Sequence, residues 1–162
     1  MDASEALTQM EVREPTAADV PELVSLEHTC FTGYYREHRL SASHFKAYLR
    51  NRRAIFLVAL GAPSLVGYIA GYTKTVRPPG SARIESLAVS PRARRHGIGG
   101  LLVRRFIEDA KQRGCRSVTL EVALANEEVI RFFSNRGFKQ CRYLRAYYSP
   151  RHDGIRMKLA IS

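Results

Sequence analysis

Between a strand-like segment and a helix-like segment, the chain reads Arg94-Arg95-His96-Gly97-Ile98-Gly99. Apolar residues then recur at helical spacing as far as Gly114, a typical helix end. The first backbone N–H groups of a helix have no partner within the helix, and the helix dipole favours negative charge there. Glycine at positions 97 and 99 lets an anion approach the backbone closely. The sequence therefore predicts a strand, an anion-binding turn and a helix, with a pyrophosphate as a fitting ligand.

The glycine spacing excludes two common nucleotide sites. It matches neither the GxxxxGK[ST] pattern of a P-loop nor the GxGxxG pattern of a Rossmann fold. A charged loop before a glycine-rich helix is the alternative interpretation of the turn alone. Further motifs follow it in order, however: Leu120-Glu121-Val122, Ala125-Asn126, Phe132-Phe133, Arg136-Gly137-Phe138, Tyr147-Tyr148 and Arg156-Met157.

This ordered series resembles the GNAT superfamily of acetyl-CoA-dependent N-acetyltransferases. Within the superfamily the chain looks most like the RimI-like group, which acetylates protein N-termini, notably ribosomal ones. The resemblance is specific from Ile84 to Met157. Before that stretch, only Val66-Gly67-Tyr68 is a familiar landmark.

Length and composition indicate one globular domain over residues 1–162. No run of 18 apolar residues is present, and the first ten residues do not resemble a signal peptide, so we expect a cytoplasmic protein without membrane association. Three cysteines stand far apart without a CxxC motif, which predicts reduced thiols and no metal site. The formal net charge is +11, and 21 of the 26 basic residues are arginine. Without a recognition motif, this charge predicts at most incidental nucleic-acid binding.

Patterning and turn residues predict an α/β (α+β) fold. We expect strands at residues 11–14, 54–60, 65–73, 84–89, 117–122, 138–146 and 155–161. We expect helices over 16–30, from 41, from 98 to 114 and from 126 to 137, with a loop over 31–40, a hairpin turn at 61–63 and a turn at 77–80. This order gives a mixed, mostly antiparallel twisted sheet of about seven strands with helices on both faces. The resemblance implies that the central strands at 84–89 and 118–122 splay apart around the pantetheine.

Two glutamates compete for the role of general base. Strand alternation places Glu121 on the face opposite Val118, Leu120 and Val122, and the resemblance implies that this glutamate is the base. A strand glutamate in an ion pair is the alternative. Glu85 is the rival base, because it shares the strand parity of Arg83, Leu87 and Val89; a salt bridge to Arg83 or Arg116 is its alternative role.

Phe133 departs from the group's pattern. The group usually carries a tyrosine there that protonates the departing sulfur, and phenylalanine has no hydroxyl to do so. Either the thiolate leaves without an enzyme acid, or Tyr147 or Tyr148 serves instead. Both of these tyrosines match a pair that the resemblance places at the amine-binding end; a substrate clamp or a core aromatic is the alternative role. A chain that binds CoA with little or no turnover is a further alternative.

The resemblance also assigns binding residues. It places acetyl-CoA against Leu87, Ala88, Val89, Arg94, Arg95, His96, Gly97, Ile98, Gly99, Gly100, Asn126, Phe132 and Phe133. Backbone groups of Leu87 and Val89 are expected to bind the pantetheine, and Asn126 is expected to cap a helix as well. Segments 31–45 and 147–156 are expected to form the acceptor side, with Phe31, Tyr34 and Asp153 as candidate contacts. Pairing with Arg151 or Arg156 is the alternative role of Asp153.

The sequence thus predicts an acetyltransferase whose acceptor is the N-terminal α-amine of a protein or peptide, with a ribosomal protein as one option. The alternative within enzymes is acetylation of a lysine side chain or of a small amine such as a polyamine or aminoglycoside. The alternative of another class is a non-catalytic CoA-binding or RNA-associated module. Monomer and homodimer both stay open.

Overall fold

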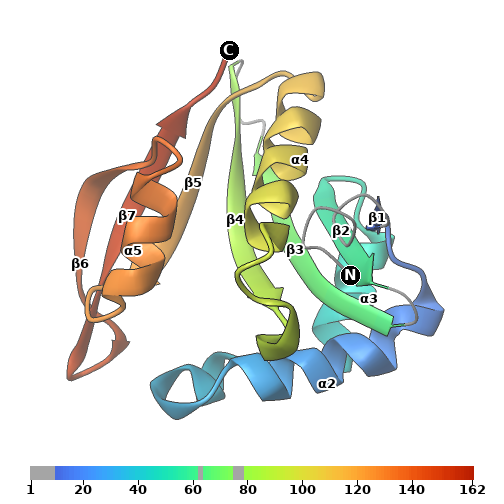
Figure 1. Ribbon diagram of the computed structural model, residues 1–162. Helices are drawn as coiled ribbons and strands as arrows, with labels where there is room; N and C mark the ends of the chain where they lie inside the picture. The colour runs from blue at the N-terminus through green and yellow to red at the C-terminus, as the bar shows by residue number, and fades with distance from the viewer. Residues whose placement is uncertain (1–9, 62–63, 75–78) are drawn as a thin grey trace.

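The computed structural model describes residues 10–61, 64–74 and 79–162, without the side chain of Tyr34 (Figure 1). The predicted turns at 61–63 and 77–80 lie partly outside the described residues. One seven-stranded sheet has the order β1-β2-β3-β4-β5-β7-β6. Its strands are β1 Glu11–Arg13, β2 Ala54–Gly61, β3 Ser64–Lys74, β4 Gly80–Val89, β5 Cys115–Ala123, β6 Lys139–Ser149 and β7 His152–Ala160. Among the described strands, only β4 and β5 pair in parallel, which confirms the predicted mixed, mostly antiparallel fold.

Helices cover both faces of the sheet, as predicted. The α-helices are α2 Val20–Cys30, α3 Ala42–Arg50, α4 Ile98–Gln112 and α5 Glu127–Ser134, and three short 3-10 helices are η1 Ala17–Asp19, η2 Gly33–His38 and η3 Pro91–Ala93. Helices α4 and α5 lie on the near face in Figure 1, and α2 and α3 pack on the far face against β2, β3 and β4. The sheet therefore separates two apolar cores.

Helix α4 forms because its sequence repeats apolar residues every three or four positions. Ile98, Leu102, Phe106 and Ala110 are all buried against the sheet. Gly114 follows the helix with φ of +82°, the left-handed conformation that ends helices favourably. The long helix predicted after the glycine turn is confirmed.

The two central strands separate. Parallel pairing between β4 and β5 runs from Gly80 opposite Cys115 to Ile84 opposite Leu120, and within the described residues it stops there. Beyond this point the strands diverge towards the bottom of Figure 1. The splayed pair predicted at 84–89 and 118–122 is confirmed.

A β-bulge at Glu85 corrects one prediction. Ala70 lies opposite Ser86, whereas Gly71 lies opposite Ile84, so Glu85 is an extra residue in β4. Leu87 and Val89 consequently pack with the α4 core, while Glu85 reaches α3 on the other face. Glu85 therefore does not share a face with Leu87 and Val89, because the bulge shifts the alternation by one residue.

Two further differences concern the acceptor side. Residues 33–38 form the 3-10 helix η2 where a loop was expected; Gly33 opens it with φ of +64°, which glycine adopts without strain. Strand β6 runs to Ser149, three residues beyond the predicted end, so that Tyr147 and Tyr148 are part of the sheet.

Among the described residues, no helix combines the length and hydrophobicity that crossing a bilayer requires.

Candidate active site

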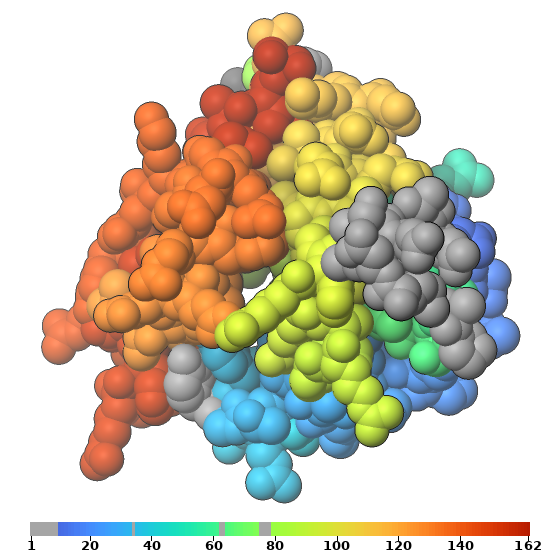
Figure 2. All heavy atoms as spheres, viewed as in Figure 1, coloured from blue at the N-terminus to red at the C-terminus, as the bar shows by residue number. Residues whose placement is uncertain are grey.

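A cavity opens where β4 and β5 part. It has a volume of about 290 Å³ and is lined by His38, Arg83, Ile84, Glu85, Glu121, Tyr147 and Tyr148. On the near face, Figure 2 shows a hollow between α5 (orange) and the loop leading into α4 (yellow-green), above the blue α2–η2 segment. The splayed strands therefore have an opening on the helix α4 side and a cavity on the α2 side. Both predicted glutamates and both predicted tyrosines line this cavity.

The glycine turn has the geometry of an anion site. Arg95 and Gly97 have φ of +67° and +77°, and Ile98 starts α4. At Gly97–Ile98 a left-handed residue is followed by a right-handed helical one, a step that turns successive N–H groups towards one side and forms a concavity that binds anions. Because this turn lies directly before a 15-residue helix, the helix N-terminus adds to the same field. The turn thus has the backbone conformation that the prediction requires, and the binding of a pyrophosphate there stays a prediction.

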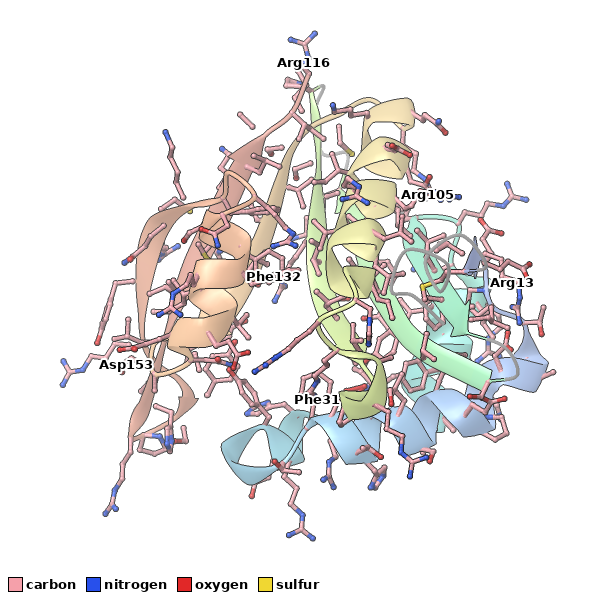
Figure 3. All side chains as sticks on the ribbon, viewed as in Figure 1. Arg13, Phe31, Arg105, Arg116, Phe132 and Asp153 are labelled. Atoms are coloured by element: carbon pink, nitrogen blue, oxygen red, sulfur yellow. The ribbon has the colours of Figure 1, made fainter. Side chains whose placement is uncertain are left out.

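The next two glycines lie close to α5. A Cβ at Gly99 would lie 3.3 Å from the Phe132 ring, and one at Gly100 would lie 2.7 Å from a guanidinium nitrogen of Arg136. That guanidinium stacks on Phe132, 3.6 Å from the ring centroid. Phe132 projects from α5 into the space in front of β4 (Figure 3). The small residues therefore let α4 and α5 approach each other beside the proposed cofactor path.

At the end of β4 that faces the gap, a backbone carbonyl is already hydrogen-bonded to side chains of the protein itself. The Val89 carbonyl accepts hydrogen bonds from Arg94 Nε at 3.1 Å and from Cys30 Sγ at 3.4 Å. The Ala88 side chain is buried on the α2 side, whereas Leu87 and Val89 lie on the α4 side. Contact between the cofactor and Ala88 would therefore involve its backbone. The backbone bonds predicted from Leu87 and Val89 to pantetheine stay predictions.

Two arginines hold Glu121. Its carboxylate accepts from Arg83 Nε at 2.8 Å and from Arg156 Nε at 2.9 Å, and its side chain is only 5% exposed. Burial acts to lower the pKa of the Arg83 guanidinium, but the charge and hydrogen bond of Glu121, together with Tyr147 and Glu85, outweigh burial and the pKa is raised. The strand alternation predicted for Glu121 is confirmed, because Val118, Leu120 and Val122 are buried on the opposite face. Glu121 is thus both in an ion pair and at the cavity wall.

Glu85 occupies the other wall of the cavity. Its carboxylate accepts a hydrogen bond from the Tyr48 hydroxyl at 2.8 Å. Burial and the nearby negative charge of Glu85 raise the pKa of Tyr48. Glu85 therefore interacts with α3, and the salt bridges to Arg83 or Arg116 weighed from the sequence are not among its interactions in the described residues.

Aromatic side chains from η2 and β6 close the acceptor end. The Tyr148 ring contacts Tyr35 and His38 edge-on, with centroids 5.5 and 5.6 Å apart. Tyr147 packs against Tyr148 at 5.0 Å, and its hydroxyl accepts from Arg83 Nη2 at 3.2 Å. Arg83 therefore connects the Tyr147 hydroxyl to the Glu121 carboxylate, because it donates a hydrogen bond to each of them.

Asn126 joins the two sides of the gap. Its side-chain oxygen accepts from the Val129 N–H at 3.3 Å, which confirms the predicted helix cap. Its amide nitrogen donates to the Tyr35 hydroxyl at 3.2 Å. The amide therefore connects the start of α5 to η2, and its predicted bond to pantetheine is not tested.

Phe133 is enclosed in the core. It is 4% exposed and contacts Phe132 and Phe138 edge-on, with centroids 5.0 and 5.3 Å apart. The position that a tyrosine occupies in the group is therefore an apolar packing position in this chain.

The three candidate acceptor contacts differ in outcome. Phe31 lies beneath the end of β4 and contacts Tyr35, and its carbonyl accepts from Arg39 Nε at 2.6 Å (Figure 3). Asp153 lies on the β6–β7 hairpin, where it accepts from the Ala146 N–H at 2.7 Å and from the Tyr143 hydroxyl. Asp153 thus stabilises the hairpin. In the described part of the chain it forms no salt bridge with Arg151 or Arg156, the alternative role weighed from the sequence. The side chain of Tyr34 lies outside the described residues.

Sequence reasoning missed four residues of this site: Tyr35, His38, Arg83 as a ligand of Glu121, and Arg156. Tyr35 and His38 fall in a segment that was expected to be a loop. Arg83 and Arg156 could have been found from register, since Glu121 lies directly opposite Arg156 in the β5–β7 pair. Among the described residues, no three His, Cys, Asp or Glu side chains gather as metal ligands.

Residues 20–138 match the model of the Acetyltransferase (GNAT) family, and the chain belongs to that family. Three relatives are similar in sequence. An uncharacterized N-acetyltransferase of Methanocaldococcus jannaschii is 28% identical over 80% of this chain and 60% of its own length. The [ribosomal protein bS18]-alanine N-acetyltransferase of Escherichia coli is 31% identical over 59% of this chain and 67% of its own. An N-alpha-acetyltransferase of Sulfurisphaera tokodaii is 27% identical over 90% of each chain.

Solved structures share the whole fold. Ard1 from Thermoplasma volcanium superposes with a TM-score of 0.83 and 28% identity, covering 94% of this chain and 98% of its own. Arabidopsis thaliana NAA60 in complex with acetyl-CoA gives a TM-score of 0.82 at 17% identity, covering 94% and 99%. The family resemblance deduced from the motifs is thereby confirmed.

Proposed function

We propose that the protein transfers an acetyl group from acetyl-CoA to the N-terminal α-amine of a protein or peptide. Family membership supports the donor and the reaction class. The relatives from Escherichia coli and Sulfurisphaera tokodaii, whose names specify alanine N-acetylation of a ribosomal protein and N-alpha-acetylation, support the acceptor class. A ribosomal protein is one acceptor of this class. A cytoplasmic location is part of the same proposal.

The observation that carries the proposal is the position of Glu121. Its carboxylate lies at the wall of the cavity, one residue beyond the last paired position of β5. The thioester carbon would reach this place through the gap between β4 and β5, with the pyrophosphate held at the start of α4. An acceptor amine that reaches Glu121 from the sheet face carrying Arg156, beside Tyr147, then meets a carboxylate and a thioester together.

The reaction requires two proton movements. An N-terminal amine has an unperturbed pKa of about 8, so a modest base suffices to remove its proton. In the proposal Glu121 accepts that proton, directly or through water, as the amine nitrogen forms a bond to the carbonyl carbon. The C–S bond then breaks, and the thiolate takes a proton. The Tyr147 hydroxyl is the proposed donor, because Phe133 has no hydroxyl.

Glu85 is the alternative base, because its carboxylate lines the same cavity. The two assignments differ in their surroundings: Glu121 is bonded to two guanidinium groups, and Glu85 to one hydroxyl. Single substitutions to glutamine therefore separate them.

The test is mass spectrometry of peptides incubated with acetyl-CoA. The panel contains free N-termini, blocked N-termini with free lysine, and common polyamines. We expect acetylation of free N-termini and a loss of kcat of at least about a hundredfold in Glu121→Gln. Glu108→Gln on the outer side of α4, where Glu108 is 62% exposed, is the matched control and should leave kcat unchanged.

Three results would count against the proposal. Acetylation only of lysine or polyamine would assign a different acceptor. Loss of activity in Glu85→Gln but not in Glu121→Gln would transfer the base role to Glu85. Binding of acetyl-CoA without any acetylation would favour the non-catalytic class.

A further inference from the structure

One face of the C-terminal half of the sheet is not covered by an α-helix in the described residues; the 3-10 helix η2 contacts it at Tyr148, near the end of β6. Helices α4 and α5 cover the face that carries Val118, Leu120, Ile155 and Met157. Helices α2 and α3 cover the opposite face only over β2, β3 and β4. In Figure 1, α5 lies in front of β5 and β7, so the uncovered face is behind these strands.

Strand register identifies the side chains on that uncovered face. Residues directly opposite each other in an antiparallel pair point to the same side. Glu121 lies opposite Arg156, which lies opposite Arg142; in the next row Thr119 lies opposite Lys158, which lies opposite Lys139. We call this set the rear basic face: Arg142, Arg156, Lys139 and Lys158, with Arg83 at its border beside Thr119.

The rear basic face carries an excess of positive charge. Lys139, Arg142 and Lys158 are exposed. Within the described residues, Glu121 is the only acidic side chain that forms a salt bridge with any member of the set. Lys139 lies opposite Lys158, and such like-charged pairs destabilise a sheet. An external anion would relieve this repulsion.

The rear basic face borders the cavity, because Arg83 lines the cavity and Arg156 binds Glu121 at the cavity wall. Strands are spaced by about 4.8 Å and rise by about 3.3 Å per residue. Lys158 and Lys139 therefore lie on the order of 10 Å from Glu121, a distance that an extended chain crosses in about three or four residues. An acceptor whose N-terminus lies at Glu121 can thus reach these lysines with its next few side chains.

We infer that the acceptor of this enzyme carries acidic residues at about its third to sixth positions, and that the rear basic face binds them. This inference rests on the proposed function. The chemistry of the face fits carboxylates on an extended peptide: lysines and arginines in two adjacent rows, beginning at the cavity wall.

An RNA strand is the other polyanion to weigh. Proteins that bind single-stranded nucleic acid combine basic residues with aromatic side chains on which bases stack. One aromatic side chain, Tyr147, borders the rear basic face, where its hydroxyl is bonded to Arg83, but no series of aromatic side chains follows the two basic rows. The observations therefore favour an acidic peptide.

The test compares acceptor peptides that share their first two residues and differ at positions three to six, which are Asp/Glu, Asn/Gln or Lys. We expect kcat/KM to be about tenfold higher for the acidic peptide than for the neutral one. The difference should arise from KM and not from kcat, and it should decrease as the salt concentration rises. The double variant Lys139→Gln, Lys158→Gln should reduce this ratio to about one. The matched control Lys46→Gln, Lys111→Gln removes the same charge from α3 and α4 and should keep the ratio.

A second measurement keeps the inference separate from the proposed function. Fluorescence anisotropy of a labelled acidic peptide reports binding without turnover. Binding that depends on Lys139 and Lys158 supports the inference even if no N-terminus is acetylated, a result that would overturn the proposed function alone. Equal kcat/KM and equal binding for acidic and neutral peptides would overturn the inference. So would lysine-dependent binding of a single-stranded RNA oligonucleotide without any preference among the peptides.

Discussion

Arg83 Nε lies 2.8 Å from Oε2 of Glu121, beside the point where β4 and β5 cease to pair. A side-chain ion pair thus connects the two strands where their backbone hydrogen bonds end. Arg156 binds the second carboxylate oxygen from β7, so Glu121 is fixed from both neighbouring strands. The two arginines therefore orient the candidate base at the point where the strands separate.

The first prediction concerns this triad. Arg83→Met and Arg156→Met should each lower the free energy of unfolding by about 1 kcal/mol, because one guanidinium remains with Glu121. The double variant should lose more than the sum, because it leaves a carboxylate that is only 5% exposed without a cation. Urea denaturation of the four proteins measures the coupling. Adding Glu121→Gln to the double variant should restore part of the loss; strict additivity would contradict the cooperative interpretation.

The second prediction concerns the proton donor. Tyr147→Phe should lower kcat by about ten- to hundredfold, because it removes the hydroxyl bonded to Arg83 in the cavity. Phe133→Tyr should not raise kcat, since that ring is 4% exposed between Phe132 and Phe138. Steady-state kinetics on one N-terminal peptide measures both. Tyr72→Phe, which removes a hydroxyl outside the cavity lining, is the control; an unchanged kcat in Tyr147→Phe would exclude Tyr147 as the donor.

Local patterns sufficed for much of the fold. The four-residue spacing of Ile98, Leu102 and Phe106 predicted α4, and alternation at Val118 and Leu120 predicted β5 with Glu121 on the other face. These signals are local, because an element buried on one side carries apolar residues at the spacing of its own helix or strand. The glycine turn could also be predicted, because Gly97 adopts a left-handed conformation that glycine takes without strain; Arg95 has the same conformation without any signal in the sequence.

The bulge at Glu85 and the partners of Glu121 could not be predicted from local sequence patterns. The bulge at Glu85 depends on a neighbouring strand, where the Cβ of any other residue at Gly71 would lie 2.0 Å from the Arg83 carbonyl oxygen. Tyr35 meets Asn126 across 91 residues of sequence. Such contacts depend on register and on the packing of distant segments, which no local period records. Alternation therefore assigned Glu85 to the wrong neighbours.

The third prediction tests that close approach. Gly71→Ala should abolish folding or lower the free energy of unfolding by more than about 3 kcal/mol, because its Cβ would meet a backbone oxygen that cannot move away without disrupting β4. Gly97→Ala should cost about 1 kcal/mol, since its φ is +77° but nothing lies within 4 Å of the new Cβ. Circular dichroism with urea denaturation measures both. Because Gly71 does not have a positive φ, equal effects would contradict the role assigned to the clash.

The last prediction concerns Glu27, a carboxyl group on α2 that is 2% exposed. It accepts hydrogen bonds from the Tyr68 hydroxyl and, at 3.3 Å, from the Leu40 N–H. Glu27 therefore connects α2 to β3 and to the short segment between η2 and α3. Burial raises the pKa of Glu27 from 4.5 to about 7, although the bond from Tyr68 acts to lower it. The folded protein therefore binds a proton at pH values where the unfolded chain has released it.

Stability should consequently decrease with pH in this range. Because the folded state holds the proton more tightly, the contribution of Glu27 is fully present below about pH 4.5 and is lost as the pH rises to about 7, by about 3 kcal/mol in all. Glu27→Gln removes this titration, so its free energy of unfolding relative to the wild type should increase by about that amount between pH 4.5 and pH 8. Urea denaturation at both pH values checks it, with Glu108→Gln as the exposed control. A constant difference between Glu27→Gln and wild type would show that folding does not change the pKa of Glu27, contrary to this prediction.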